Sequence, residues 1–307
     1  METIKALIVS DGKPGHFNQS IALCRYKNWN YEIVTVKYKS KFSKLCSYIL
    51  DKLGIYSELL FASDIKPVNI SVVVSTGSTT YYPAKTFAIN LHAKNIAIML
   101  PKGYRYDFDY ILAQAHDNPP NQKNIIKLPI NLVLTTPEYN QEEMTKRFIF
   151  DNSKKYIGVI IGGPNSIFSI SIEDLKPLFE YLFSLDSVNI VVTTSRRTPK
   201  EIEEWLASLP LSYLLRYSLD TFNPIPAFLQ NCQNIVITSD STSMISEAVS
   251  YGKSNIDILM LKSKKSSKFH TLIKNLEAAQ ALHVFNGNLS QKNSKVLFEK
   301  YLEEIKF

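Results

Sequence analysis

Residues 235–252 read IVITSDSTSMISEAVSYG and contain a strand, a polar hinge and a helix in succession. The β-branched run over 234–238 predicts a buried strand, and the pattern over 244–251 predicts a helix that ends at Gly252. The hinge between them carries the hydroxyls of Ser241, Thr242 and Ser243. The first N–H groups of a helix have no partner within the helix, and its dipole adds roughly half a positive charge there. The segment therefore predicts an anion site that suits a phosphate.

The same residues also fit a simpler interpretation, in which Asp240 or Ser241 only caps the helix. One segment does not separate a capped helix from a phosphate site. The choice between them depends on what the rest of the chain places beside this helix.

Length and composition describe a globular protein with room for two α/β domains. The chain has 307 residues, of which 45% are hydrophobic and 21% charged. No apolar run reaches the roughly 18–20 residues that span a bilayer, and the first residues lead into a strand without the layout of a signal peptide. The three cysteines are scattered and lack CxxC spacing, which favours neither a disulfide framework nor a zinc site. We expect a cytoplasmic protein without a metal or cofactor.

The net charge of +7 predicts an anionic partner. A nucleotide or an anionic membrane surface would explain this charge, and so would a basic background without function. The sequence contains no helix-turn-helix, zinc-finger or RNP-like signature, so we expect no nucleic-acid partner.

The first half of the chain alternates apolar β-branched runs with helical patterns. This alternation predicts a parallel sheet with helices on both faces. We expect strands at 4–9, 31–37, 70–75, 95–100, 110–113 and 125–127, and helices at 17–26 and 83–91. Ligands of such sheets lie beyond the carboxyl ends of the strands. Three loops at those ends carry candidate residues of an acceptor site or cleft: Gly12, Lys13, Gly15, Gly77, Ser78, His116 and Asp117.

Residues 42–61, FSKLCSYILDKLGIYSELLF, form an amphipathic segment flanked by lysines. The favoured interpretation is a helix with an apolar face on the core and a polar face in solvent. The alternative is an interfacial helix that docks on anionic lipid.

The second half repeats the α/β pattern. Strands are expected at 156–161, 188–193, 211–216, 234–238 and 255–259. Helices are expected at 138–151, 172–185, from Pro199, at 223–229 and at 267–278, with a terminal helix at 292–305. We therefore predict two similar domains facing each other across a cleft, at 1–136 and 137–290. Residues 291–307 would be a helix that packs back across the junction.

Two adjacent arginines, Arg196 and Arg197, follow the strand at 188–193 together with Ser195. A guanidinium matches the geometry of a phosphate, and each charge-assisted bond contributes roughly 1.5–3 kcal/mol. Glu247 lies one to two turns inside the helix after Ser241, where its carboxylate could accept hydrogen bonds from a ribose diol or simply be solvated. We expect this half to bind a diphosphate.

Four motifs together resemble the mitochondrial fission (elongated mitochondria) family, whose members are known from plants and bacteria. The motifs are SDGKPGHFNQS (10–20), GGPNS (162–166), TTSRRTP (193–199) and TSDSTSMISEA (238–248), and the pair His116-Asp117 resembles the family too. The resemblance implies glycosyltransferase activity and the GT-B architecture of two Rossmann-like domains, with the nucleotide sugar held mainly by the second.

The resemblance also implies roles for individual residues. Gly162, Gly163 and Arg196 would border the nucleotide and its diphosphate, as would Ser241, Thr242 and Ser243, and Glu247 would take the ribose. The loop at 12–16 resembles, more loosely, the glycine-rich loop of the lipid-linked peptidoglycan glycosyltransferase, where a histidine lies close to the acceptor.

We therefore predict transfer of a sugar from a nucleotide-diphospho-sugar to an acceptor hydroxyl, with His16 or Asp11 as the base. No DxD motif is present, so we expect no metal at the leaving group. A glycolipid or lipopolysaccharide-type acceptor suits the basic charge, together with peripheral contact at the inner face of a membrane. Two alternatives are a non-catalytic membrane-recruitment adaptor and a sugar-nucleotide epimerase of the same fold.

Overall fold

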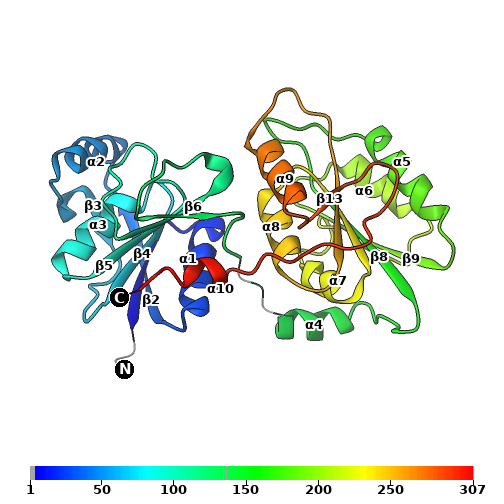
Figure 1. Cartoon of the computed structure of the whole chain (residues 1–307), viewed down its shortest axis with the longest axis horizontal. Helices are drawn as coiled ribbons and strands as arrows, with labels where there is room; N and C mark the ends of the chain where they lie inside the picture. The colour runs from blue at the N-terminus through cyan, green and yellow to red at the C-terminus, as the bar shows by residue number, and fades with distance from the viewer. Residues whose placement is uncertain (1–3, 134, 136, 307) are drawn as a thin grey trace. The chain divides into compact units, whose positions relative to one another are not determined.

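The chain forms two compact units, each built on its own sheet. The computed structural model describes residues 4–133, 135 and 137–306. The first unit is Met1–Leu134 with Leu297–Phe307, and the second is Thr135–Val296 (Figure 1). The predicted α/β class with two Rossmann-like sheets is confirmed.

The first unit contains a seven-stranded sheet in the order β3-β2-β1-β4-β5-β6-β7. The strands are β1 (Lys5–Ser10), β2 (Asn30–Tyr38), β3 (Phe61–Ser63), β4 (Val72–Thr76), β5 (Lys94–Ile98), β6 (Tyr110–Gln114) and β7 (Ile125–Leu128). Neighbouring strands are parallel except for the β2–β3 pair. The strand order reverses between β1 and β4, and a ligand of an open α/β sheet binds beyond the strand ends at such a reversal.

The helices of the first unit are α1 (Pro14–Tyr26), α2 (Lys41–Leu53), α3 (Tyr81–Asn90) and α10 (Glu299–Leu302), with 3₁₀ turns η1 (Glu58–Leu60) and η2 (Ala115–Asp117). Alternate residues of the central strands, among them Leu7, Val9 and Val73, pack against the buried side of α3. This period of two is what a strand buried on both faces requires.

The second unit repeats the same order in six parallel strands, β10-β9-β8-β11-β12-β13. The strands are β8 (Lys155–Ile161), β9 (Val188–Thr194), β10 (Tyr213–Leu215), β11 (Asn234–Thr238), β12 (Asn255–Leu259) and β13 (His283–Val284). The helices are α4 (Pro137–Thr145), α5 (Ile172–Phe183), α6 (Lys200–Ala207), α7 (Ile225–Asn231), α8 (Thr242–Ser250) and α9 (Lys268–Ala278). The reversal here lies between β8 and β11.

Two helices at the carboxyl edges begin earlier than the sequence pattern predicts. Helix α1 begins at Pro14, so Gly15 and His16 lie in its first turn and not in the preceding loop. Helix α8 begins at Thr242 with Ser241 as its N-cap. The apolar period starts only after these polar first turns. For this reason the sequence pattern predicted the start of each helix too late in the chain. The strands β3 and β13 were missed because they have only three and two residues.

The predicted terminal helix over 292–305 is wrong in length, because only α10 is helical. The residues before it bond to the second unit instead, where Val296 donates its N–H to the Val249 carbonyl at 2.9 Å. The last turn rests on the first unit. Lys27 donates to the carbonyls of Leu302 and Ile305 at 3.2 and 3.1 Å, which supplies partners for orphan groups at the helix end.

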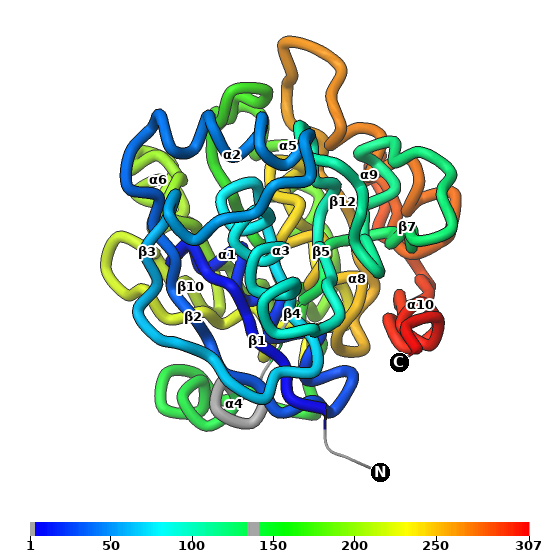
Figure 2. The backbone as a smooth tube through the Cα atoms, turned by 90° about the vertical axis from the view of Figure 1, so that its left-hand side faces the viewer, coloured from blue at the N-terminus to red at the C-terminus, as the bar shows by residue number. Residues whose placement is uncertain are grey.

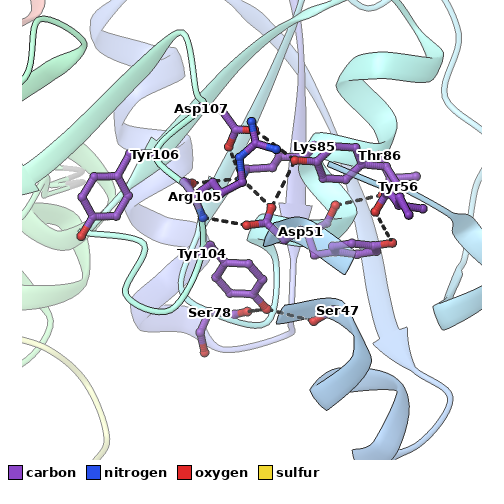
Figure 3. A network of polar contacts seen from close by, with 12 residues as sticks. Ser47, Asp51, Tyr56, Ser78, Lys85, Thr86, Tyr104, Arg105, Tyr106 and Asp107 are labelled. Carbon is purple, nitrogen blue, oxygen red and sulfur yellow. Dashed lines mark hydrogen bonds and ion pairs between the residues drawn. The ribbon is translucent and has the colours of Figure 1, made fainter. Parts of the chain in front are cut away.

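A buried ion-pair network attaches α2 to the first unit (Figure 3). The carboxylate of Asp51 on α2 is fully buried and accepts a bond from the Lys85 ammonium at 2.6 Å. It also accepts from the backbone N–H of Arg105 at 2.6 Å, and Lys85 donates in addition to Asp107. The predicted apolar contact of this helix with the core is made by Tyr48 and Leu50, which are partly buried against it. The side chains of α2 that are buried most completely, Ser47 and Asp51, are polar.

Candidate functional site

The carboxyl edge of the second sheet brings together the loops that follow β8, β9 and β11. Gly162 and Gly163 follow β8, Ser195 follows β9, and Ser239 and Asp240 follow β11. Because β9, β8 and β11 are neighbours in the sheet, these three loops converge at the reversal of strand order.

The buried carboxylate of Asp240 joins these loops. One oxygen accepts the Thr238 hydroxyl at 2.7 Å. The other accepts the Gly163 N–H at 3.0 Å and the Arg197 guanidinium at 2.6 Å. The Asp240 side chain has no exposed surface, so these bonds compensate the charge that folding removes from water. Asp240 thus holds the three loops in position. From the sequence, its place between a strand and a helix indicated only a possible helix cap.

The two glycines after β8 are required by this packing. A Cβ on Gly162 would lie 2.1 Å from a carboxylate oxygen of Asp240, and one on Gly163 would lie 2.0 Å from the Arg197 carbonyl oxygen. Both distances are impossible for real atoms. The glycines therefore allow the loops to approach each other, whatever they contribute to a ligand.

Arg197 is engaged within the protein. Besides its bond to Asp240, the guanidinium donates to the carbonyls of Gly163 and Pro164 at 3.2 and 3.3 Å. Its charge is therefore matched by a buried carboxylate. The structure therefore gives Arg197 a structural role as the partner of Asp240. Its contact with a diphosphate stays a prediction.

Arg196 differs from its neighbour because it is exposed. Within the described ranges 4–133, 135 and 137–306, none of the ion pairs or hydrogen bonds involves its guanidinium. Ser195 is partly buried, and its hydroxyl accepts the Arg197 N–H at 3.3 Å. Arg196 is thus a cation at the carboxyl end of β9 that is available to an anion.

The N-terminus of α8 lies at the end of β11. The Ser241 hydroxyl accepts the Met244 N–H at 3.4 Å, so the capping interpretation is correct for Ser241. Thr242 and Ser243 form the first turn, and Ser243 is exposed. A cap satisfies only one of the several N–H groups at a helix start, so capping and anion binding are compatible.

Glu247 is partly buried on α8, one turn beyond these residues. Burial raises the pKa of its carboxyl to about 7. No ion pair or side-chain hydrogen bond compensates this burial within the part of the chain that the structure describes. A carboxyl with raised pKa near a strand-end loop is typical of a functional position.

In the first unit, Asp11 and His16 meet at the reversal between β1 and β4. The imidazole Nδ1 lies 3.1 and 3.2 Å from the two carboxylate oxygens of Asp11. The Lys13 ammonium lies 3.1 Å from the same carboxylate. Burial pushes the pKa of Asp11 upward, but the hydrogen bond from Lys13 and the charge of His16 outweigh it and hold the pKa below its usual range. The carboxylate therefore orients the imidazole.

Gly77 brings the loop after β4 against this pair. Its backbone has φ +92°, and a Cβ there would lie 2.6 Å from Cε1 of His16. The histidine ring therefore packs on the Gly77 backbone. Gly12 also needs a left-handed backbone, with φ +77°, whereas an added Cβ at Gly15 would meet nothing within 4 Å.

Lys44 is a residue of this edge that sequence reasoning missed. Its ammonium donates to the Ser78 carbonyl and to the Tyr104 hydroxyl. The rings of Tyr38, Tyr48 and Tyr104 surround it at 4.7–5.0 Å from their centroids. Burial lowers the pKa of Lys44 to about 8, against the opposing effect of the Asp11 charge. The available signal was that Lys44, Ser47 and Asp51 share one polar face of α2.

His116 and Asp117 lie in η2 after β6, two strands beyond β4. His116 is buried, and Asp117 pairs with Lys102 at 3.3 Å. The structure brings the loops after β1 and β4 into contact through His16 and Gly77. The third candidate loop follows a strand that lies two positions from β4 in the sheet.

A cavity of about 390 Å³ lies at the opposite edge of the second sheet, against Lys155, Gln233 and Asn255. These residues stand at the amino ends of β8, β11 and β12, where parallel sheets do not place their ligands. Of the residues that the structure describes, no three or more His, Cys, Asp and Glu side chains group so as to hold a metal ion.

Two solved structures of nucleotide-sugar enzymes are similar in fold. Heptosyltransferase II of E. coli, an ADP-heptose lipopolysaccharide enzyme, aligns over 98% of this chain and 97% of its own, with TM-score 0.50 and 10% identity. The UDP-GlcNAc 2-epimerase of Neisseria meningitidis, bound to UDP-GlcNAc, aligns over 93% of this chain and 88% of its own, with TM-score 0.50 and 12% identity. At this level of identity the similarity establishes the fold, which is that of GT-B glycosyltransferases.

Comparison of the sequence is more specific than comparison of the fold. Protein RP120 of Rickettsia prowazekii (strain Madrid E) is 26% identical, over 98% of this chain and 97% of its own length. The model of the family described as mitochondrial fission ELM1 matches residues 14–301. That span includes residues 14–20 of the first sequence motif and the other three motifs in full, and the chain belongs to the mitochondrial fission ELM1 family.

Proposed function

We propose that this chain transfers a sugar from a nucleotide-diphospho-sugar to an acceptor hydroxyl. The observation that carries the proposal is the exposed Arg196, in a loop that the Arg197–Asp240 ion pair ties to the segment before α8. An uncommitted guanidinium and a helix start are both complementary to a phosphate. Similar folds that use ADP-heptose or bind UDP-GlcNAc support a donor of this class.

The donor would lie on the second unit. Its diphosphate would contact Arg196 and the first turn of α8 at Thr242 and Ser243. The carboxyl of Glu247 would hydrogen-bond the ribose diol, which gives a polar partner to a group that burial leaves protonated near neutral pH. Gly162, Gly163 and Arg197 would shape the edge through Asp240.

The acceptor would lie on the first unit, where Asp11 orients His16. With Nδ1 bonded to Asp11, the imidazole Nε2 can take the proton of the acceptor hydroxyl. The acceptor oxygen then forms a bond to the sugar carbon, and the bond from that carbon to the diphosphate oxygen breaks. The nucleoside diphosphate leaves with the electron pair. Arg196 and the α8 dipole would stabilise its charge in place of a metal.

The proposed acceptor is a glycolipid or a lipopolysaccharide-type glycan, reached by peripheral contact with the inner face of a membrane. The basic net charge of +7 supports contact with an anionic surface. None of the described helices is long and apolar enough to cross a membrane.

A sugar-nucleotide epimerase is a second candidate, favoured by the fold similarity to the Neisseria enzyme. Epimerisation needs carboxyls near the sugar. The carboxyl of Glu247 could act in this way. By contrast, the carboxylate of Asp11 is paired with His16 and Lys13, and that of Asp117 is paired with Lys102. Release of free nucleoside diphosphate from a responding donor separates transfer from epimerisation. A chain that binds no nucleotide would instead support the adaptor alternative.

We expect one or more of the uridine, guanosine, cytidine and adenosine diphosphates, or their sugars, to raise the melting temperature. Arg196→Ala should weaken the best ligand about tenfold to a hundredfold, because one charge-assisted contact contributes roughly 1.5–3 kcal/mol. Calorimetric titration measures the change. Lys176→Ala, which removes an exposed charge from α5, is the matched control and should bind as the wild type does. Equal affinity of the Arg196 variant would remove this residue from the site.

His16→Ala should leave nucleotide affinity unchanged and lower kcat about 10²–10⁴-fold, the usual contribution of a positioned base. Turnover is followed as nucleoside diphosphate release in the presence of acceptor. Lys13→Ala keeps the Asp11–His16 bond and should retain most of the activity. Full transfer by the His16 variant would show that another group takes the proton.

Glu247→Gln should change how stability depends on pH. The carboxyl loses its proton near pH 4.5 when unfolded and near pH 7 when folded, so the free energy of unfolding falls as pH rises through this window. Gln does not titrate, so the variant lacks this decrease. Relative to the wild type, its free energy of unfolding should rise by roughly 1.4 kcal/mol per pH unit between pH 4.5 and 7, with no difference at pH 4. Urea unfolding at several pH values measures the gain. Exposed Glu180→Gln should parallel the wild type, and parallel curves for Glu247→Gln would contradict the raised pKa.

A further inference from the structure

Helix α2 presents four large apolar side chains to solvent, while its Tyr48 and Leu50 pack against the core. Phe42, Leu45, Ile49 and Leu53 are 72%, 58%, 55% and 65% exposed. At 100° per residue these four positions fall within an arc of about 80° and form one continuous stripe. A surface helix of a globular protein normally turns such a stripe toward the core, whereas the stripe of α2 faces solvent.

The polar face of α2 explains why the helix holds this orientation. Asp51 is tied to Lys85 and to the Arg105 backbone, and the buried Ser47 hydroxyl lies 3.1 Å from that of Tyr104 (Figure 3). Lys44 is held among three tyrosines. These buried bonds would be lost if the helix rotated to bury its stripe. The exposure of the stripe is thus built into the fold.

The charges that flank the stripe are all of one sign. Every exposed charged side chain between residues 37 and 57 is a lysine: Lys37, Lys39, Lys41 and Lys52. The single acid of this segment, Asp51, is buried and paired. Beyond the end of α2, Leu59 is 77% exposed, and the exposed Glu58 beside it accepts a hydrogen bond from Asn90 at 2.7 Å. Figure 2 shows α2 along the outside of the first unit.

We propose that the α2 stripe, with its flanking lysines, docks the chain on an anionic lipid bilayer. An apolar helix face flanked by lysines is the pattern of a helix that lies in the membrane interface, where apolar burial and attraction to anionic headgroups act together. The inference deepens the proposed membrane contact and rests on it. It does not depend on transferase chemistry, and its test uses neither donor nor acceptor.

The test is co-sedimentation of the full chain with vesicles of phosphatidylglycerol and phosphatidylethanolamine, against vesicles of phosphatidylcholine alone. We expect binding to the anionic vesicles that weakens at high salt. Leu45→Ser combined with Ile49→Ser should lower the partition coefficient at least roughly tenfold, because two apolar side chains leave the interface. Lys41→Gln combined with Lys52→Gln should weaken binding to anionic vesicles and leave retention on neutral ones unchanged.

The matched control is Leu219→Ser, which removes a 70% exposed leucine from the second unit and should bind as the wild type does. All four replaced α2 side chains are exposed, and circular dichroism checks that the variants fold. Equal binding to neutral and anionic vesicles, or unchanged binding of the Leu45 and Ile49 variant, would overturn the proposal. So would a dimer in solution that this variant dissociates, because a second copy would then cover the stripe.

Discussion

The buried carboxylate of Asp240 holds the carboxyl edge of the second unit together. It accepts bonds from the Thr238 hydroxyl, the Gly163 N–H and the Arg197 guanidinium, so one charge fixes three loops. Removal of one partner would leave a buried charge uncompensated, which is strongly destabilising. The two consecutive arginines therefore have different surroundings. Arg197 pairs with Asp240, and Arg196 is exposed and is the residue that we propose for the diphosphate.

The sequence was sufficient for the sheet architecture because runs of β-branched residues alternate with helical patterns over almost the whole chain. The motifs also identified the edges where polar loops converge. The partners of individual side chains could not be predicted, since Arg196 and Arg197 carry identical chemistry and only the position of Asp240 distinguishes them. The apolar period of α2 identifies the stripe but not the buried pair of Asp51 and Lys85, so the sequence did not predict that the stripe faces solvent.

The two units use the same strand order for different chemistry. In the first, the reversal between β1 and β4 brings an imidazole against Gly77, where a side chain would displace it. In the second, the reversal between β8 and β11 leaves a helix start and a guanidinium available. The proposed base and the proposed anion site thus belong to separate sheets, an arrangement compatible with a reaction between a bound donor and a separate acceptor. Glu247 adds a carboxyl whose burial lowers stability at neutral pH, a cost that function would explain.

The central claim is that the donor nucleotide binds at the carboxyl edge of the second sheet. Hydrogen–deuterium exchange of the chain with saturating nucleoside diphosphate tests it most directly. We expect slower exchange in peptides that cover 194–199 and 239–247, and unchanged exchange in those that cover 151–155 and 253–255 around the cavity at the opposite edge. Protection at that cavity or on the first unit, with none at the carboxyl edge, would contradict it.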